Sequence, residues 1–177
     1  SAHKMDIDLI VMGSRGASGI KEIIIGSNTE KVVRTSDIPV LVIKKEESNF
    51  KIKDVVFACE FTDEYKQSFL KAITFANLSN ATLHLLVVNT PSSFMTTSNA
   101  EERMNSFLQD VSIGEYTLNI YNDVSVEKGI LNFGNSINAD VIAMSTHGRQ
   151  GLSHFFNGSI SEDLVNHSKR PVVTFKI

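Results

Sequence analysis

The chain has 177 residues, of which 42% are hydrophobic and 21% are charged, and its formal net charge is −3. This composition is typical of a soluble globular α/β protein, and the small acidic balance argues against nucleic acid or an anionic membrane as the main partner. A single cysteine excludes an internal disulfide and a cysteine-based zinc site, and no apolar run is as long as a membrane span. We expect a cytoplasmic protein without a signal peptide.

The first 45 residues predict strand, loop, helix and strand. Residues 7–12, which are apolar apart from Asp8, form a run that ends at Gly13, as in a strand buried on both faces. A glycine-rich loop follows, and Ser27 and Glu30 have the spacing of a capping box that begins a helix. Residues 40–43 predict the second strand, and a polar linker follows it.

The rest of the chain predicts five strands in alternation with helices, which is the pattern of a doubly wound parallel sheet. Ligands of such sheets bind beyond the carboxyl ends of the strands, where the strand order reverses. We therefore expect a site at Glu60 and Ser145, which end the first and the fourth strand. The strands are predicted at residues 54–59, 81–89, 116–121, 140–144 and 172–176, and the helices at residues 63–78 and after capping residues Ser98, Ser125 and Ser159.

One stretch occurs twice at a constant offset of 132 residues, from Asp8 to Lys44 and from Asp140 to Lys176. Such a repeat indicates a duplicated structural unit. A piece as short as the first 45 residues cannot cover both faces of its own strands. It docks on the complete unit, pairs with another chain, or belongs to a longer tandem protein, and we favour the last. The predicted domains are residues 1–45, the C-terminal part of a first domain, and residues 46–177, a complete one.

Glycines recur at fixed intervals in the loop of the first copy, at Gly13, Gly16 and Gly26. Glycine lets the backbone turn with positive φ and approach a ligand, and amides at a helix start attract anions. A plain loop that ends in a helix cap is the alternative, although it does not require this spacing. Neither a lysine-bearing phosphate loop nor the dinucleotide glycine motif is present.

With Gly13-x2-Gly16-x9-Gly26-Ser27, the sequence resembles the universal stress protein family, whose nucleotide-binding members carry Gly-x2-Gly-x9-Gly-[Ser/Thr]. Residues 146–153, Thr-His-Gly-Arg-Gln-Gly-Leu-Ser, resemble the same region of the family. The resemblance covers residues 5–45 and 50–177. It implies a five-stranded, Rossmann-like parallel sheet of the adenine nucleotide alpha hydrolase type, dimers formed through the last strand, and ATP binding in some members.

Carried over residue by residue, the resemblance implies contacts to adenine and ribose from Ala58, Glu60 and Val88. The remaining implied ligand contacts are Met144, Ser145, Gly148, Gly151, Gly158, Ser159, Ile160 and Ser161 in the complete copy, and Gly13, Gly16, Gly26 and Ser27 in the first copy. Two positions depart from the family pattern: Glu60 replaces an aspartate, and Ser145 replaces the first motif glycine. We expect the Ser145 side chain to occupy space where the backbone would approach the ligand.

Other candidate residues have simpler interpretations. His84 alternates with leucines in a strand and is predicted to be a structural histidine, and Cys59 a small buried hydrophobe. His147 either touches a phosphate or faces solvent. No metal site is expected, because His147, His154 and His167 share no helical spacing.

Three functions remain open. The first is a regulatory stress-response protein that binds ATP or another phosphate-bearing ligand without turnover. The second is a scaffold that pairs through its last strands, as a homo-oligomer or within a tandem chain, and binds no nucleotide. The third, an ATPase or phosphotransferase, is the weakest, because no metal-binding carboxylate pair is visible. The resemblance admits ATP and Mg²⁺ as ligands and requires neither.

Overall fold

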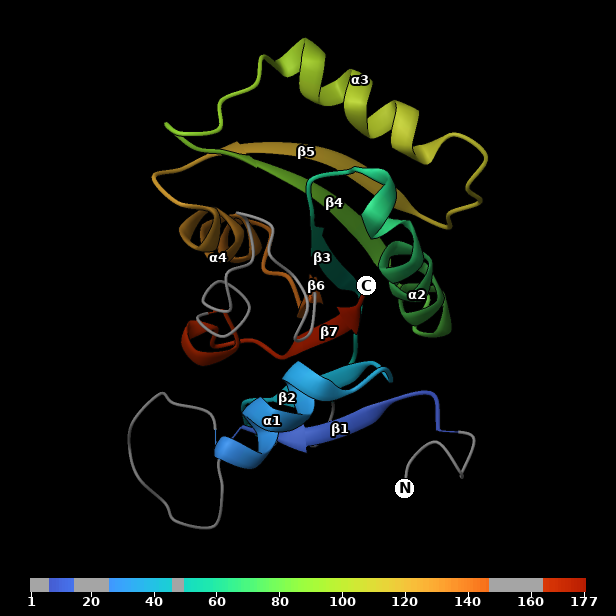
Figure 1. The fold of residues 1–177 in the computed structure, drawn as a ribbon, viewed down its shortest axis with the longest axis vertical. Coiled ribbons are helices and arrows are strands. Elements are labelled where there is room, and N and C mark those ends of the chain that lie inside the picture. Colours follow the sequence, from blue (N-terminus) through green and yellow to red (C-terminus); the bar gives the residue numbers. More distant parts are fainter. Residues whose placement is uncertain (1–6, 15–25, 46–49, 147–163) are drawn as a thin grey trace.

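The computed structural model describes residues 7–14, 26–45, 50–146 and 164–177. Within these residues, seven strands form one sheet (Figure 1). The strands are β1 (Ile10–Gly13), β2 (Val40–Ile43), β3 (Asp54–Ala58), β4 (Thr82–Asn89), β5 (Tyr116–Asn122), β6 (Val141–Thr146) and β7 (Val172–Lys176). The helices are α1 (Ser27–Thr35), the 3₁₀ turn η2 (Asp63–Tyr65), α2 (Lys66–Leu78), α3 (Thr97–Leu108) and α4 (Val126–Ser136). Residues 164–167 are also helical.

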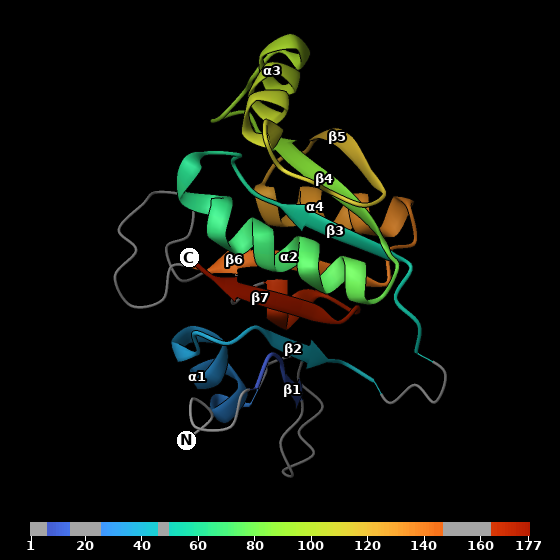
Figure 2. The same ribbon diagram turned by 90° about the vertical axis from the view of Figure 1, so that its right-hand side faces the viewer.

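The strand order is β1-β2-β7-β6-β3-β4-β5. The five strands β7, β6, β3, β4 and β5 run parallel to one another, as predicted for residues 46–177. The sheet nevertheless has seven strands where five were predicted, because β1 and β2 extend it beyond β7. Strand β2 is parallel to β1 but antiparallel to β7 (Figure 2).

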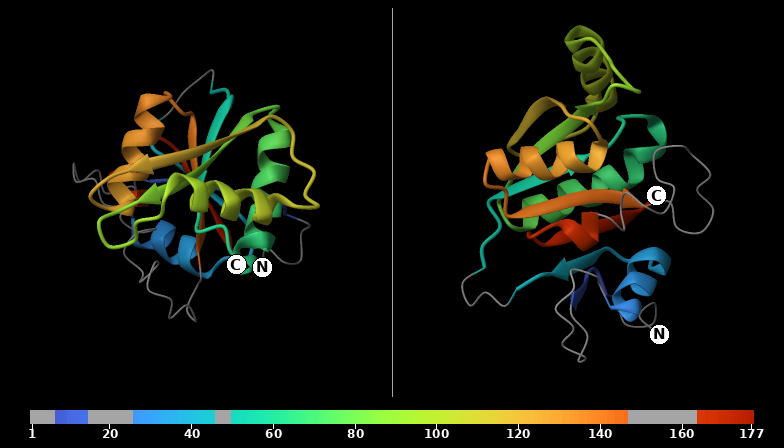
Figure 3. Two further views of the ribbon diagram at one scale, coloured as in Figure 1. Left: turned by 90° about the horizontal axis from the view of Figure 1, so that it is seen from above. Right: turned by 90° about the vertical axis from the view of Figure 1, so that its left-hand side faces the viewer.

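Helices cover both faces of the sheet, as in a doubly wound fold. Figures 1 and 3 show α2 and α4 on opposite sides of β3 and β4. Helix α2 packs through Phe69, Ile73 and Ala76, which are buried as their spacing predicts. The Phe69 ring centroid lies 5.5 Å from that of Phe57 in β3 and 5.1 Å from that of Phe107 in α3, so these rings join two helices to the sheet.

Where both copies of the repeat are described, they share the register of their strand pair and the turn before the last strand. Ile10 pairs with Val40 in β1 and β2, and their repeat equivalents, Ile142 and Val172, pair in the same way in β6 and β7. The turn before the last strand also recurs. Ser36 Oγ accepts the amide of Ile38 at 3.1 Å, and its equivalent, Ser168 Oγ, accepts the amide of Arg170 at 3.1 Å.

The two copies meet through β2 and β7 with local two-fold symmetry. Leu41 pairs with Val173, which is its own equivalent in the repeat. Val40 pairs with Thr174, and Val42 with Val172, so each pair is exchanged with the other by the repeat offset. Residues thus contact their own equivalents, as they do at an isologous dimer interface.

Two equivalent lysines cross this junction in opposite directions. Lys176 Nζ lies 2.6 Å from Asp37 Oδ1, and Lys44 Nζ donates to the carbonyl oxygen of Val165. Burial lowers the pKa of Lys44 to about 8. Lys44, predicted as part of a polar linker, is therefore a half-buried part of the junction.

The predicted helix caps are correct in one of the three described cases. Ser125 Oγ accepts the amide of Lys128 at 3.3 Å and caps α4, as predicted. Helix α3 is capped instead by Thr96, whose Oγ1 accepts the amide of Asn99 at 3.3 Å, so the cap predicted at Ser98 is wrong. Helix α1 has Gly26 at its N-cap without a side-chain bond, and Ser27 is its first helical residue. The cap predicted at Ser159 lies outside the described residues.

His84 is a structural histidine, as its place in the strand predicts. Its Nε2 lies 2.9 Å from Asp54 Oδ1, and its Nδ1 lies 2.8 Å from Thr117 Oγ1. The ring therefore bridges β3, β4 and β5 near their amino ends.

Candidate functional site

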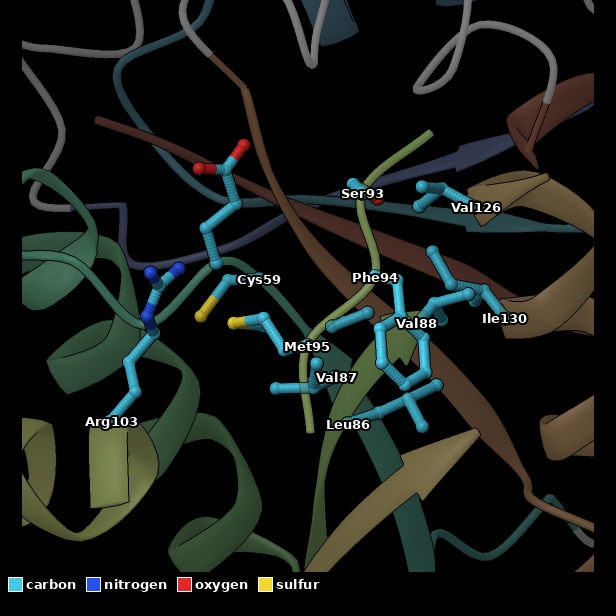
Figure 4. Close-up of a pocket in the computed structure, with 12 residues that line it drawn as sticks. Cys59, Leu86, Val87, Val88, Ser93, Phe94, Met95, Arg103, Val126 and Ile130 are labelled. Carbon is cyan, nitrogen blue, oxygen red and sulfur yellow. The ribbon is translucent and has the colours of Figure 1, made fainter. Parts of the chain in front are cut away.

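A cavity of about 240 Å³ lies at the carboxyl ends of β3 and β4. Ala58 and Leu86, which are paired neighbours in these strands, form part of its wall. Val126 and Ile130 of α4 form another part, and Phe94 lies in the loop that leaves β4 (Figure 4). The walls are mainly apolar, which is the usual character of a small-molecule site.

Glu60 and Arg103 supply opposite charges to this apolar cavity. Glu60 follows β3, and Arg103 comes from the exposed face of α3. A carboxylate accepts hydrogen bonds from hydroxyl or amino groups, whereas a guanidinium donates to anionic oxygens. The cavity can therefore hold a flat apolar group and orient polar substituents at its rim.

Three residues predicted as adenine and ribose contacts, Ala58, Glu60 and Val88, line this one cavity. The structure brings them together because β3 and β4 are parallel neighbours in the sheet. Ligand contact by these residues stays a prediction.

The site was expected at the ends of the first and fourth strands of the complete unit. Glu60 lines the cavity, but Ser145 at the end of β6 does not. Ser145 is fully buried, and its Oγ lies 2.7 Å from Ser68 Oγ in α2. The hydroxyl is thus bonded to α2, and ligand contact by Ser145 stays a prediction. Met144, also predicted as a contact, is 1% exposed and pairs with Ala58 in the sheet.

The described ones among the predicted contacts of the first copy, Gly13, Gly26 and Ser27, lie at the opposite edge of the sheet. Because β2 runs antiparallel to β7, the carboxyl end of β1 points away from the edge that holds the cavity. Gly13 accepts a hydrogen bond from Thr29 Oγ1 at 3.1 Å, and the Gly26 amide donates to the Ser14 carbonyl at 3.2 Å. Gly13, Gly26 and Ser27 therefore do not join the cavity. The predicted contacts Gly16, Gly148, Gly151, Gly158, Ser159, Ile160 and Ser161 lie outside the described residues.

Cys59 is half-buried beside the cavity, and its Sγ accepts the amide of Phe61 at 3.4 Å. Burial raises the pKa of this thiol. The thiol therefore stays protonated at neutral pH and behaves as the small hydrophobe that the sequence predicts.

Phe94, Met95 and Arg103 line the cavity although the sequence did not single them out. The loop after β4 has no apolar periodicity, and Arg103 lies on a polar helix face. One signal was available: a phenylalanine within a short polar loop that follows a buried strand.

Among the described residues, no group of three or more His, Cys, Asp or Glu is arranged to hold a metal ion. His167 instead lies 2.7 Å from Glu127 Oε1 through its Nδ1. None of the helices in the described part of the chain is both long and apolar enough to span a membrane.

The fold and this cavity define a doubly wound α/β protein with an apolar pocket at the carboxyl edge of its sheet. The sequence profile of the universal stress protein family matches residues 2–44 and 51–176. The chain belongs to the universal stress protein family.

Known relatives agree with this assignment. A universal stress protein of Methanocaldococcus jannaschii is 50% identical over 47 residues, which are 27% of this chain and 29% of that protein. A universal stress protein of Archaeoglobus fulgidus DSM 4304 has a similar structure, with a TM-score of 0.70 and 28% identity. That match covers 99% of this chain and 63% of the other, so this chain spans less than two thirds of that relative. The structure of a universal stress protein in complex with cAMP shares the fold, with a TM-score of 0.56, 16% identity, and coverage of 71% and 98% of the two chains.

Proposed function

We propose that this chain is a regulatory stress-response protein that binds an adenine nucleotide, or a related phosphate-bearing ligand, without catalytic turnover. One observation carries the proposal. Ala58, Glu60 and Val88, the residues at which the family resemblance implies base and ribose contacts, line a single cavity. The cAMP complex of a structural neighbour supports a nucleotide as the ligand class.

The size of the cavity limits which part of a nucleotide it holds. Its volume of about 240 Å³ is below the roughly 300–1,000 Å³ of sites that enclose a whole drug-sized ligand. The base and part of the ribose fit this space, and the phosphates extend beyond it. The glycine-rich segment that follows β6 remains our proposed phosphate site, and Mg²⁺ would enter only with the phosphates.

Titration with ATP, with and without Mg²⁺, tests the proposal by calorimetry and by assay of released phosphate. We expect binding near the micromolar range, about −8 kcal/mol, which a buried base and a few polar contacts can supply. We expect no phosphate release beyond that of the buffer. Failure to bind at millimolar ATP would leave the scaffold function, and release of phosphate would establish an enzyme.

A matched pair of variants locates the binding. Glu60→Gln removes a charge from the cavity and is expected to weaken binding about tenfold, because a hydrogen bond to a charged group contributes roughly 1.5–3 kcal/mol. Glu101→Gln makes the same change on the exposed surface of α3 and is expected to leave affinity unchanged. Equal affinities of the two variants would place the ligand elsewhere.

The second candidate function is that of a scaffold, and the pairing of β2 with β7 favours it. The symmetric register indicates a surface adapted to pair with its own equivalent. We propose that the chain belongs to a tandem protein of the cytoplasm. In this proposal residues 1–45 are the C-terminal part of a first family domain, and residues 46–177 are a complete second domain. Homo-oligomers through the same strand are the alternative form of this proposal. The two functions are compatible, since the cavity and the junction occupy different strands.

A further inference from the structure

We call the loop from Thr90 to Thr96 the strap. The buried side chain of Asn89 holds it at the cavity by hydrogen bonds. Asn89, the last residue of β4, is 5% exposed. Its Nδ2 donates to the carbonyl oxygen of Met95 at 3.0 Å, and its Oδ1 accepts the amide of Met95 at 3.2 Å. The side-chain amide thus holds both polar groups of one strap residue, as a neighbouring strand would.

Further contacts hold the two halves of the strap. Thr90 is buried, and its Oγ1 lies 2.8 Å from Ser93 Oγ, while the Ser93 amide donates to the Thr90 carbonyl at 3.1 Å. At the other end, Thr96 caps α3. The strap is therefore fixed at its start, at Met95 and at its end.

This framework holds the Phe94 ring at the cavity, although the ring has little packing of its own. Phe94 is 72% exposed, yet it lines the cavity together with Val88 and Ile130. Figure 4 shows the Phe94 ring at the cavity together with Val88 and Ile130. The same ring borders an open hollow formed with Asn122 and Asp123, so it separates the two spaces. Because the polar contacts of the strap keep the Phe94 ring exposed at the cavity, one face of the ring is accessible to a ligand.

We propose that Phe94 is the specificity-determining wall of the site, and that its ring stacks on a flat purine base inserted between the strap and α4. This inference rests on the proposed nucleotide-binding function. An aromatic face favours planar heterocycles, with little distinction among their polar substituents. Glu60 at the rim then orients the sugar, and Asn89 acts as a positioning residue that keeps the ring in place.

The absence of tryptophan from the sequence provides a direct test. Phe94→Trp introduces a single indole at the stacking position. With excitation at 295 nm, we expect AMP and ATP to quench its fluorescence saturably, at the same concentrations at which calorimetry detects binding. We expect tripolyphosphate, which carries the charge but no base, to leave the signal unchanged. Binding of AMP without any change in emission would overturn the stacking.

Substitution of the ring measures its contribution. We expect Phe94→Ala to weaken binding of AMP at least about fivefold, and Phe94→Tyr to retain it, since stacking on an aromatic side chain is lost only in the first. Leu78→Ala removes a similarly exposed apolar side chain from the end of α2 and is the matched control, with unchanged affinity expected. Equal affinities of the alanine variant and the unmodified protein would contradict the inference.

The role of Asn89 is tested by changing it alone and in combination with Phe94. Asn89→Asp retains the acceptor for the Met95 amide and loses the donor, which bonds the Met95 carbonyl and also Asn122 Oδ1 at 3.2 Å. We expect this variant to bind AMP more weakly, and we expect the effect to vanish when Phe94 is already alanine, because Asn89 acts only by placing the ring. A loss that persists in the double variant would assign Asn89 a general structural role.

The outcomes for the two proposals are distinct. If the unmodified protein binds no adenine nucleotide, the proposed function fails. If it binds AMP, and Phe94→Ala binds equally well, only the stacking inference fails.

Discussion

At the scale of single residues, Ser145 shows how a departure from a family motif is accommodated. Ser68 Oγ donates to the carbonyl oxygen of Tyr65 at 2.9 Å, which uses its single hydroxyl proton. The 2.7 Å contact between the two serine hydroxyls therefore requires Ser145 to donate to Ser68. The extra side chain is thus bonded within the core beneath α2, away from the cavity.

We predict that Ser145→Ala lowers the free energy of unfolding by about 1 kcal/mol, the net contribution of one hydrogen bond. Nucleotide affinity is expected to stay unchanged, because the side chain does not face the cavity. Urea denaturation and calorimetric titration measure the two quantities. A change in affinity without a change in stability would show that Ser145 faces the ligand.

The family resemblance singled out Ala58, Glu60 and Val88 as candidate contacts, and all three line one cavity. It did not single out Phe94, because the position of this residue depends on a hydrogen bond from Asn89 to Met95 that no periodicity encodes. The hydrogen bond between Ser145 and Ser68 was not predicted for a similar reason. Strand alternation assigns a side chain to one of the two faces of the sheet. Only the packed structure shows which residue of the covering helix it contacts.

At the scale of elements, α4 lies close to β4 because of one glycine. A Cβ added at Gly129 would lie 2.4 Å from Val88 Cγ1 and 3.1 Å from Val88 Cγ2. Valine cannot rotate both methyl groups away, since its χ1 is restricted. Gly134, one turn further along the same helix, is different, because its added Cβ would meet Ile142 Cδ1 at an ordinary 3.7 Å.

We predict opposite effects of alanine at these two glycines. Gly129→Ala is expected to destabilise the protein by about 1–3 kcal/mol through overpacking, and to weaken ligand binding by displacing Val88. Gly134→Ala is expected to stabilise it by about 0.5–1 kcal/mol, because alanine favours the helix and limits the unfolded chain. Thermal denaturation of both variants provides the comparison. Stabilisation by both would mean that α4 can move off β4 without cost.

The existence and order of the elements were predictable, because their apolar periods are regular. The caps of α1 and α3 were not, since several residues near each helix start can act as caps. Residues 96–99 are Thr-Thr-Ser-Asn, all acceptable at an N-cap, and the strap decides among them by holding Thr96 in extended backbone.

At the scale of the whole molecule, β2 covers an edge that β7 would otherwise expose. Strand β7 is buried at four of its five residues, and its partner across the junction is the equivalent strand of the repeat. The sequence showed that both strands are buried, but an apolar run does not reveal which edge it pairs with. The seven-strand count was missed for this reason.

We predict that a chain shortened to residues 46–177 forms a dimer through β7. Without β2, the exposed edge is expected to pair antiparallel with its copy, with Val173 facing Val173 as Leu41 faces Val173 in the full chain. Sedimentation of the shortened and full chains at equal concentration measures this difference. A monomeric shortened chain with an intact circular dichroism spectrum would contradict the prediction.

The reversal of strand direction between β2 and β7 also determines the directions from which ligands approach the two ends of the sheet. A ligand at the carboxyl ends of β3 and β4 approaches from one side of the molecule. A ligand at the carboxyl end of β1 approaches from the opposite side. Among the described strands, the two copies are joined through the short ladder of β2 and β7, which is centred on Leu41 and Val173.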